Sequence, residues 1–158
     1  MTQRVGHGYD IHRFSDEPDR PLVLGGVTIE GSRGLEGHSD ADAIAHAAAD
    51  AVLGPAGLGD LGRHFPDDDE RWAGADSLTL LSEVVRLAGR DGWRVVNIDV
   101  TVVAQAPKLA PHREAMQQRL SDAAGAPVTV KATTAEGLGP VGRGEAIAAH
   151  AVALLESS

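Results

Sequence analysis

The chain of 158 residues contains no cysteine, and aromatic residues make up only 3% of it. The missing cysteines exclude disulfides and every metal site that depends on thiolate ligands. The scarcity of aromatic rings argues against the base-stacking platforms that bind single-stranded nucleic acids. Positive charge is also scarce, because 14 Lys and Arg face 23 Asp and Glu, for a formal net charge of −9. We therefore expect no nucleic acid partner, since such surfaces are rich in Lys and Arg.

Long hydrophobic runs are missing as well. No apolar stretch approaches the roughly 20 residues that a transmembrane helix needs, and residues 1–4 lack the apolar core of a signal peptide. These absences predict no membrane partner and a cytoplasmic location, or a plastid location in a eukaryote, although no transit peptide is present. Hydrophobic residues form 42% of the chain, which is enough for a single domain over residues 1–158 with a sizeable core.

Strand and helix patterns alternate along the chain. The sequence predicts strands at residues 3–9, 22–24, 27–29, 95–103 and 128–132. It predicts helices at residues 41–53, 78–88, 111–124 and 145–155. Gly25 and Gly26 lie between two short apolar runs and indicate a two-residue hairpin turn. The alternation favours an α/β fold of the α+β type with a small mixed sheet.

Three residues form a candidate metal site. Asp10 and His12 are two positions apart in an extended segment, so their side chains point to the same face. His46 lies on the helix predicted at residues 41–53. Two imidazoles and a carboxylate suit Zn²⁺ or another divalent transition metal, and three protein ligands leave one position open, as in catalytic sites. From these residues alone, an equally open interpretation is a strand end and a solvated helix face.

Two segments rich in glycine and polar residues are candidates for ligand binding. In residues 57–69, glycines allow the backbone to come close to a ligand, and an acidic run follows them. A solvated turn has the same composition. In residues 131–145, Thr133 and Thr134 supply hydroxyls, Lys131 and Arg143 supply positive charge, and Glu136 supplies an oxygen suited to Mg²⁺. The alternative for this segment is a threonine-rich turn followed by a helix cap.

Five motifs taken together carry a resemblance. In chain order they are Gly8-Tyr9-Asp10-Ile11-His12-Arg13-Phe14, His38-Ser39-Asp40-Ala41-Asp42 with His46, Gly59-Asp60-Leu61-Gly62 with Phe65-Pro66-Asp67, Ala106-Pro107-Lys108, and Thr133-Thr134-Ala135-Glu136 with Gly142-Arg143-Gly144-Glu145. From about residue 3 to 156, the chain resembles the 2-C-methyl-D-erythritol 2,4-cyclodiphosphate synthase family. The resemblance implies a homotrimer whose subunits each have a small, mainly antiparallel mixed sheet with helices on one face. It also implies active sites shared between neighbouring subunits.

The activity that the resemblance implies is that of a phosphorus-oxygen lyase. It would cyclise 4-diphosphocytidyl-2-C-methyl-D-erythritol 2-phosphate to 2-C-methyl-D-erythritol 2,4-cyclodiphosphate and release CMP, in non-mevalonate isoprenoid biosynthesis. The substrate's own 2-phosphate is the nucleophile, which agrees with a chain that has no cysteine and shows no Ser-His-Asp motif. Two alternatives stay open, a metal-dependent phosphohydrolase and a non-catalytic trimer that binds cytidine nucleotides.

The resemblance also assigns residues. Asp10, His12 and His46 would bind Zn²⁺, and Glu136 would bind Mg²⁺ or Mn²⁺ together with the substrate diphosphate. The catalytic residues would be His38, Thr134 and Glu136. The substrate-binding residues would be His38, Ser39, Asp60, Gly62, Phe65, Asp67, Ala104, Pro107, Lys108, Leu109, Ala132, Thr133, Thr134 and Arg143. Asp50, one helical turn beyond His46, is predicted to orient that imidazole, although an exposed helix carboxylate is an equally open interpretation.

Overall fold

A four-stranded sheet runs the length of the molecule in the computed structural model, which describes residues 1–157. Its strand order is β1-β6-β4-β5, with β1 at Gln3–Arg13, β4 at Trp93–Val103, β5 at Val128–Thr133 and β6 at Ala146–Ser157. Strand β6 pairs antiparallel with both β1 and β4, whereas β4 and β5 are parallel. The predicted small mixed sheet with mainly antiparallel pairing is therefore confirmed.

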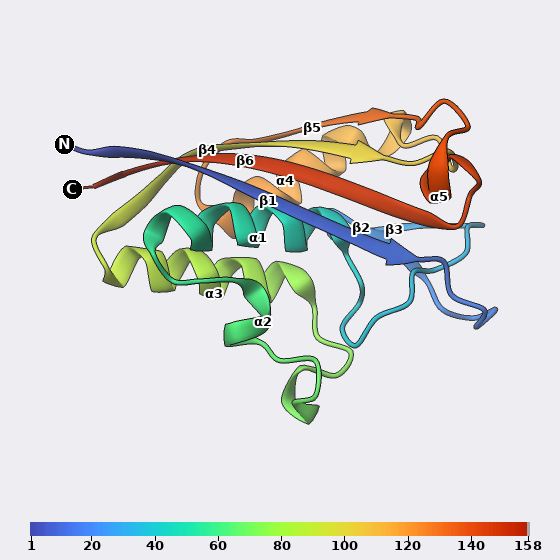
Figure 1. Ribbon diagram of the computed structural model, residues 1–158, viewed down its shortest axis with the longest axis horizontal. Helices are drawn as coiled ribbons and strands as arrows, with labels where there is room; N and C mark the ends of the chain where they lie inside the picture. Colours follow the sequence, from blue (N-terminus) through green and yellow to red (C-terminus); the bar gives the residue numbers. More distant parts are fainter. Residues whose placement is uncertain (158) are drawn as a thin grey trace.

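Three helices cover one face of this sheet (Figure 1). They are α1 (Ala43–Ala56), α3 (Ser77–Arg90) and α4 (Arg113–Ala124). Shorter elements lie in the connections, namely the hairpin β2 (Leu22–Leu24) and β3 (Val27–Ile29), the helices α2 (Leu61–His64) and α5 (Gly139–Gly142), and two 3₁₀ turns at Glu70–Trp72 and Ala110–His112. Among the described residues, no helix combines the length and apolar character that crossing a membrane requires.

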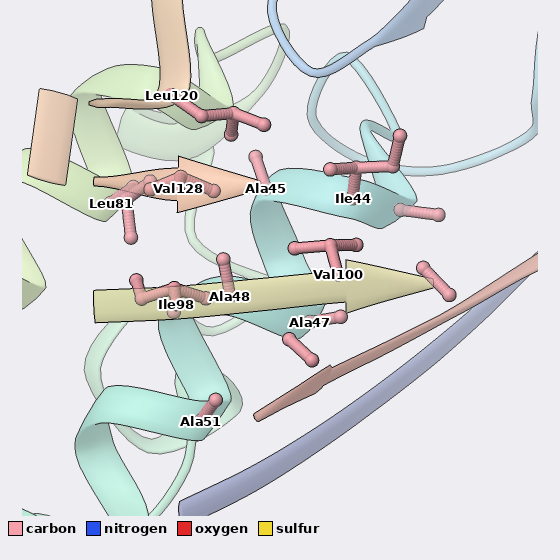
Figure 2. Close-up of a cluster of buried hydrophobic side chains, with 14 of the residues drawn as sticks. Ile44, Ala45, Ala47, Ala48, Ala51, Leu81, Ile98, Val100, Leu120 and Val128 are labelled. Atoms are coloured by element: carbon pink, nitrogen blue, oxygen red, sulfur yellow. The ribbon is translucent and has the colours of Figure 1, made fainter. Parts of the chain in front are cut away.

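The core lies between the helices and the sheet. Figure 2 shows the alanines of α1 facing Ile98 and Val100 of β4, with Leu81 of α3 and Leu120 of α4 beside them. These residues are almost completely buried. Small side chains on α1 allow that helix to lie close to the sheet, while the larger side chains of α3 and α4 fill the space beyond it.

The helix predicted at residues 145–155 is wrong, because this segment forms strand β6. Its alanines favour a helix when the local sequence is considered alone. In the structure, Ile147, Ala149 and Ala151 face the core, and His150 and Val152 face the opposite side. This alternation has the period of a strand. Hydrogen bonding to β1 on one side and β4 on the other outweighs the helical preference.

Asp42 anchors the start of α1. Its buried carboxylate accepts the backbone N–H of Ala45 in the first turn at 3.1 Å, so Asp42 is the N-cap. It also accepts the N–H groups of Gly25 and Gly26, at 2.8 and 2.7 Å. Both glycines have positive φ, as expected for the predicted hairpin turn. Burial, together with the charge of Asp40, raises the pKa of Asp42 to about 6.

We predict that Asp42→Ala lowers the free energy of unfolding by about 2–4 kcal/mol, because three backbone N–H groups lose their acceptor. Asp76→Ala provides the matched control, since Asp76 caps α3 through one exposed bond to the N–H of Leu78. That change should cost about 1 kcal/mol or less. Urea unfolding of both variants measures the difference, and equal losses would contradict an anchoring role for Asp42.

Candidate metal centre and substrate pocket

Helix α1 lies directly against β1 because two glycines of the strand face it. Gly6 and Gly8 point to the same side of β1 as Asp10 and His12. A Cβ atom on Gly8 would lie 1.9 Å from the carbonyl oxygen of Ala47, and one on Gly6 would lie 2.0 Å from that of Ala51. Only glycine therefore allows the helix backbone to come so near. The contact brings residue 46 of the helix next to residue 10 of the strand.

The ligand atoms of Asp10, His12 and His46 form a compact triangle. His12 Nε2 lies 2.7 Å and His46 Nδ1 lies 3.1 Å from Asp10 Oδ2, and the two nitrogens are 3.3 Å apart. A tetrahedral ion with bonds of about 2.0–2.1 Å holds its ligand atoms ~3.3 Å apart. The three side chains are between 12% and 24% exposed. The kinds of ligand atom, the distances between them and the partial exposure of the side chains thus fit a divalent metal ion.

A backbone carbonyl orients the imidazole of His12. Its Nδ1 lies 2.8 Å from the carbonyl oxygen of Glu36, which can only accept a hydrogen bond. His12 Nδ1 therefore carries the proton and donates it, and the lone pair of the neutral ring is on Nε2. That nitrogen faces Asp10 and His46, which is the arrangement that a metal ligand requires.

Electrostatic effects in the triangle favour a bound cation. Burial alone would raise the pKa of Asp10, but its contacts with the imidazoles of His12 and His46 outweigh that effect and hold the pKa below its usual value. Burial would lower the pKa of His12, but the hydrogen bond and negative charge of Asp10 outweigh that effect and raise it. Without a metal, the Asp10 carboxylate therefore stabilises a proton on His12. Metal binding would displace this proton.

A pocket of about 540 Å³ lies beside the triangle, and His12 and His46 belong to its wall. Five residues predicted to bind substrate also line it, namely His38, Ser39, Gly62, Phe65 and Asp67. Sequence reasoning did not identify Trp72 and Leu80, which complete part of the apolar wall. Trp72 packs edge-on against Phe65 with ring centroids 4.8 Å apart. The pocket thus combines an apolar surface with polar groups close to the metal ligands.

Two carboxylates near this pocket hold helix α2. Asp60, a predicted substrate-binding residue, is its N-cap and accepts the N–H of Arg63 at 3.0 Å. Asp50 accepts the N–H of Leu61 at 2.7 Å. The prediction that Asp50 orients His46 is therefore wrong, since the Nε2 atom of His46 lies 2.8 Å from the hydroxyl of Ser77. No local sequence pattern signals a contact between residues 31 positions apart.

The other predicted residues gather at the carboxyl ends of β4 and β5. These strands pair in parallel, and the N–H of Ala104 donates to the carbonyl of Thr133 at 3.0 Å. We call this group the β4–β5 set, and it comprises Ala104, Pro107, Lys108, Leu109, Ala132, Thr133, Thr134, Glu136 and Arg143. The described lining of the metal-side pocket includes none of these residues. Strand β5 and the metal-bearing β1 form opposite edges of the sheet, about 14 Å apart at ~4.8 Å per strand.

Within the β4–β5 set, most side chains are exposed. Glu136 has a positive φ of 54°, and its N–H donates to Thr134 Oγ1 at 3.2 Å, so a tight turn presents its carboxylate to solvent. Arg143 Nε pairs with Glu145 at 2.5 Å. Ala132 is exposed, although it points to the same side of β5 as the buried Val128 and Val130. The end of β5 therefore extends beyond the part of the sheet that the helices cover, whereas Val102 at the end of β4 stays buried.

The fold and the triangle define an α/β protein with a candidate divalent-metal site beside a substrate-sized pocket. The model of the YgbB family matches residues 3–156, and the chain belongs to this family. It is 57% identical over 155 residues to the 2-C-methyl-D-erythritol 2,4-cyclodiphosphate synthase of Synechococcus sp. (strain JA-2-3B'a(2-13)). This match covers 96% of this chain and 98% of that protein. The family predicted from the five motifs is thus confirmed.

Relatives with a second domain and solved structures give the same assignment. The bifunctional enzyme IspD/IspF of Anaeromyxobacter dehalogenans is 61% identical over 96% of this chain, which spans only 39% of that protein. The bifunctional IspDF structure from Campylobacter jejuni superposes with a TM-score of 0.93 at 39% identity, over 99% of this chain and 43% of that one. The CDP complex of IspF from Plasmodium falciparum superposes with a TM-score of 0.84 at 32% identity, over 99% of this chain and 97% of that one.

We predict that Gly8→Ala both destabilises the fold and weakens metal binding, because the new methyl group would collide with the backbone of α1. The expected loss is about 3 kcal/mol of unfolding free energy and roughly a tenfold loss of Zn²⁺ affinity. Gly54→Ala is the matched control, because Gly54 lies on the exposed side of α1 with open space around it. It should stabilise by about 0.5–1 kcal/mol and leave metal affinity unchanged.

Urea unfolding and competition titration with a zinc chelator provide the two measurements. If Gly8→Ala binds Zn²⁺ as tightly as Gly54→Ala does, the close approach of α1 to β1 does not position the metal ligands.

Proposed function

We propose that this protein is a metal-dependent cyclase that converts 4-diphosphocytidyl-2-C-methyl-D-erythritol 2-phosphate into 2-C-methyl-D-erythritol 2,4-cyclodiphosphate and CMP. Residues 1–158 would form a single domain of this lyase, acting in non-mevalonate isoprenoid biosynthesis. Relatives that are 54–57% identical over nearly their whole length carry the name of this synthase. The observation that carries the proposal is that His12 and His46 belong at once to the candidate metal triangle and to the pocket wall.

The proposed reaction requires no protein nucleophile. An oxygen of the 2-phosphate attacks the β-phosphorus of the diphosphate, a new P–O bond closes the ring, and the P–O bond to the CMP phosphate breaks. No water is consumed. Asp10, His12 and His46 would hold a divalent ion, whose positive charge would reduce the repulsion between the reacting anions and polarise a phosphate oxygen.

The protein groups would orient the substrate. The Nε2 atom of His38 lies 2.9 Å from the carbonyl of Asp69, which fixes this ring at the pocket wall. His38 and Ser39 are suited to contact the 2-phosphate, and the apolar surface around Phe65 is suited to the methyl-bearing carbon chain. Because the pocket is partly apolar, it would exclude water from the attack and so favour ring closure over hydrolysis.

We assign the β4–β5 set to the cytidine diphosphate part of the substrate. Glu136, with Thr134 beside it, would hold Mg²⁺ or Mn²⁺ on the diphosphate, since a carboxylate is a ligand of the type that these ions prefer. Lys108 and Arg143 add positive charge. A solved relative is described as a CDP complex, which supports a cytidine diphosphate ligand here.

Analysis of the products tests the cyclase against the two alternatives. Phosphorus NMR of a reaction with Zn²⁺ and Mg²⁺ should show the cyclic diphosphate and one equivalent of CMP, without inorganic phosphate. His46→Ala should reduce turnover by at least about 100-fold, because it removes a metal ligand from the wall of the pocket. Release of phosphate with a ring-opened product would indicate a phosphohydrolase. Binding of CDP without turnover would indicate a binding protein.

We further propose that the protein is a homotrimer in which each active site combines the metal triangle of one subunit with the β4–β5 set of its neighbour. Apolar side chains support a subunit contact on the face of the sheet that lacks helices within residues 1–157. Val5 is 71% exposed, Tyr9 48%, Ile11 41% and Val152 46%. A contiguous apolar surface of this kind favours burial against another chain. The position of the two residue sets on opposite edges of the sheet supports a shared site.

Mixing two inactive variants tests the shared site. His46→Ala and Thr134→Val should each be inactive, because each lacks one half of every site. After unfolding, equal mixing and refolding, about one site in four should have both halves intact, since each site draws one half from each of two neighbours in a closed ring. A mixture of His46→Ala with His12→Ala is the control and should regain nothing. Recovery of no activity from trimers of the first pair would place the whole site within one chain.

A further inference from the structure

Ser77 makes a buried contact with the metal-side histidine of α1. The hydroxyl oxygen of Ser77 lies 2.8 Å from His46 Nε2, on the side of the ring opposite the nitrogen that faces Asp10. Ser77 is only 1% exposed and is the first residue of α3. The contact therefore joins two helices through the ring of a candidate metal ligand, and the proposed metal chemistry assigns no role to it.

Asp40 determines the direction of this hydrogen bond. Its carboxylate accepts the N–H of Ser77 at 3.0 Å and the N–H of Asp42 at 3.1 Å, and a further close contact joins it to the Ser77 hydroxyl. A carboxylate can only accept, so the single hydroxyl proton of Ser77 is donated to Asp40. The Ser77 oxygen is left with lone pairs alone. It must therefore accept the proton of His46 Nε2.

We infer that Asp40 and Ser77 are positioning residues that hold His46 as the Nε2–H tautomer and thereby keep the Nδ1 lone pair directed at the metal. The hydroxyl oxygen of Ser39 lies 3.2 Å from the same Nε2 atom and accepts the N–H of Ala41, so it is a second acceptor available to the Nε2 proton. The effect of this tautomer on metal binding rests on the proposed metal site. Its structural part, the tautomer of His46, follows from the hydrogen bonds alone.

The two histidines of the triangle would thus be held in opposite tautomers by different devices. A main-chain carbonyl keeps the proton of His12 on Nδ1, whereas a carboxylate and a hydroxyl keep that of His46 on Nε2. A neutral imidazole binds a metal only through its unprotonated nitrogen. Partners that fix the other nitrogen typically change metal affinity by 10–100-fold.

The first measurement is nitrogen-15 NMR of the imidazole rings in the metal-free wild-type protein at pH 8.5, above the ordinary histidine pKa of about 6.5. Wild-type His46 should show a protonated Nε2 and an unprotonated Nδ1. Protonated Nδ1 would mean that Ser77 donates to the ring and that Asp10 accepts from it, which would overturn the inference. This result depends on no catalytic activity.

The second measurement is Zn²⁺ affinity by chelator competition. Ser77→Ala should bind Zn²⁺ about 10–100-fold more weakly, and its His46 signals should move toward a mixture of tautomers. Ser77→Thr keeps the hydroxyl and should remain within about threefold of wild type. Ser82→Ala is the matched control, because Ser82 lies on the same helix and its hydroxyl also donates one hydrogen bond, to the carbonyl of Ala123, but away from the metal side. This control should leave the Zn²⁺ affinity and the His46 NMR signals unchanged.

Equal Zn²⁺ affinities of Ser77→Ala and Ser82→Ala would overturn the positioning role. Wild-type protein that binds no Zn²⁺ would refute the proposed metal site instead, and the His46 tautomer in that same sample would still decide whether Ser77 and Asp40 control the ring.

Discussion

The site depends on one close contact between backbone and backbone. Because Gly6 and Gly8 have no side chain, the carbonyls of Ala51 and Ala47 reach β1 directly. The metal triangle continues the same arrangement, since Asp10 and His12 are the next two residues on that face of the strand and His46 precedes Ala47 on the helix. Beyond the glycines, the ligand side chains lie between the strand and the helix. Packing and chemistry therefore share one interface.

Local patterns were sufficient for much of this arrangement. The spacing of Asp10 and His12 identified two ligands because a strand repeats every second residue, and Gly25-Gly26 marked the hairpin because that turn needs positive φ. The segment from Ala146 was misassigned, since alanine favours helices and the pairing of β6 with both neighbours is not visible locally. The roles of Ser77 and Asp50 were missed for a related reason. Both depend on contacts formed only when α1, α2 and α3 pack together.

The two halves of the proposed site differ in how firmly the chain holds them. Asp42, Asp40 and Asp50 each accept backbone N–H groups around α1, so the metal side is braced by several buried or partly buried carboxylates. The β4–β5 set is mostly exposed and lies at the end of β5 and in the segments that follow β4 and β5. A neighbouring subunit and a bound nucleotide would supply the contacts that this half lacks within one chain. A rigid metal side and an adaptable nucleotide side would suit binding of a long, flexible substrate.

The metal triangle also has a consequence for folding. Asp10 and His46 are 36 positions apart, and their ligand atoms meet only when β1 and α1 are already packed. A divalent ion would therefore bind the folded chain far more tightly than the unfolded one, and by mass action it would add to the stability of the fold. Thermal stability would then vary with the concentration of free metal ions. The protein's lifetime under heat or proteolysis would thus be tied to the metal supply of its surroundings.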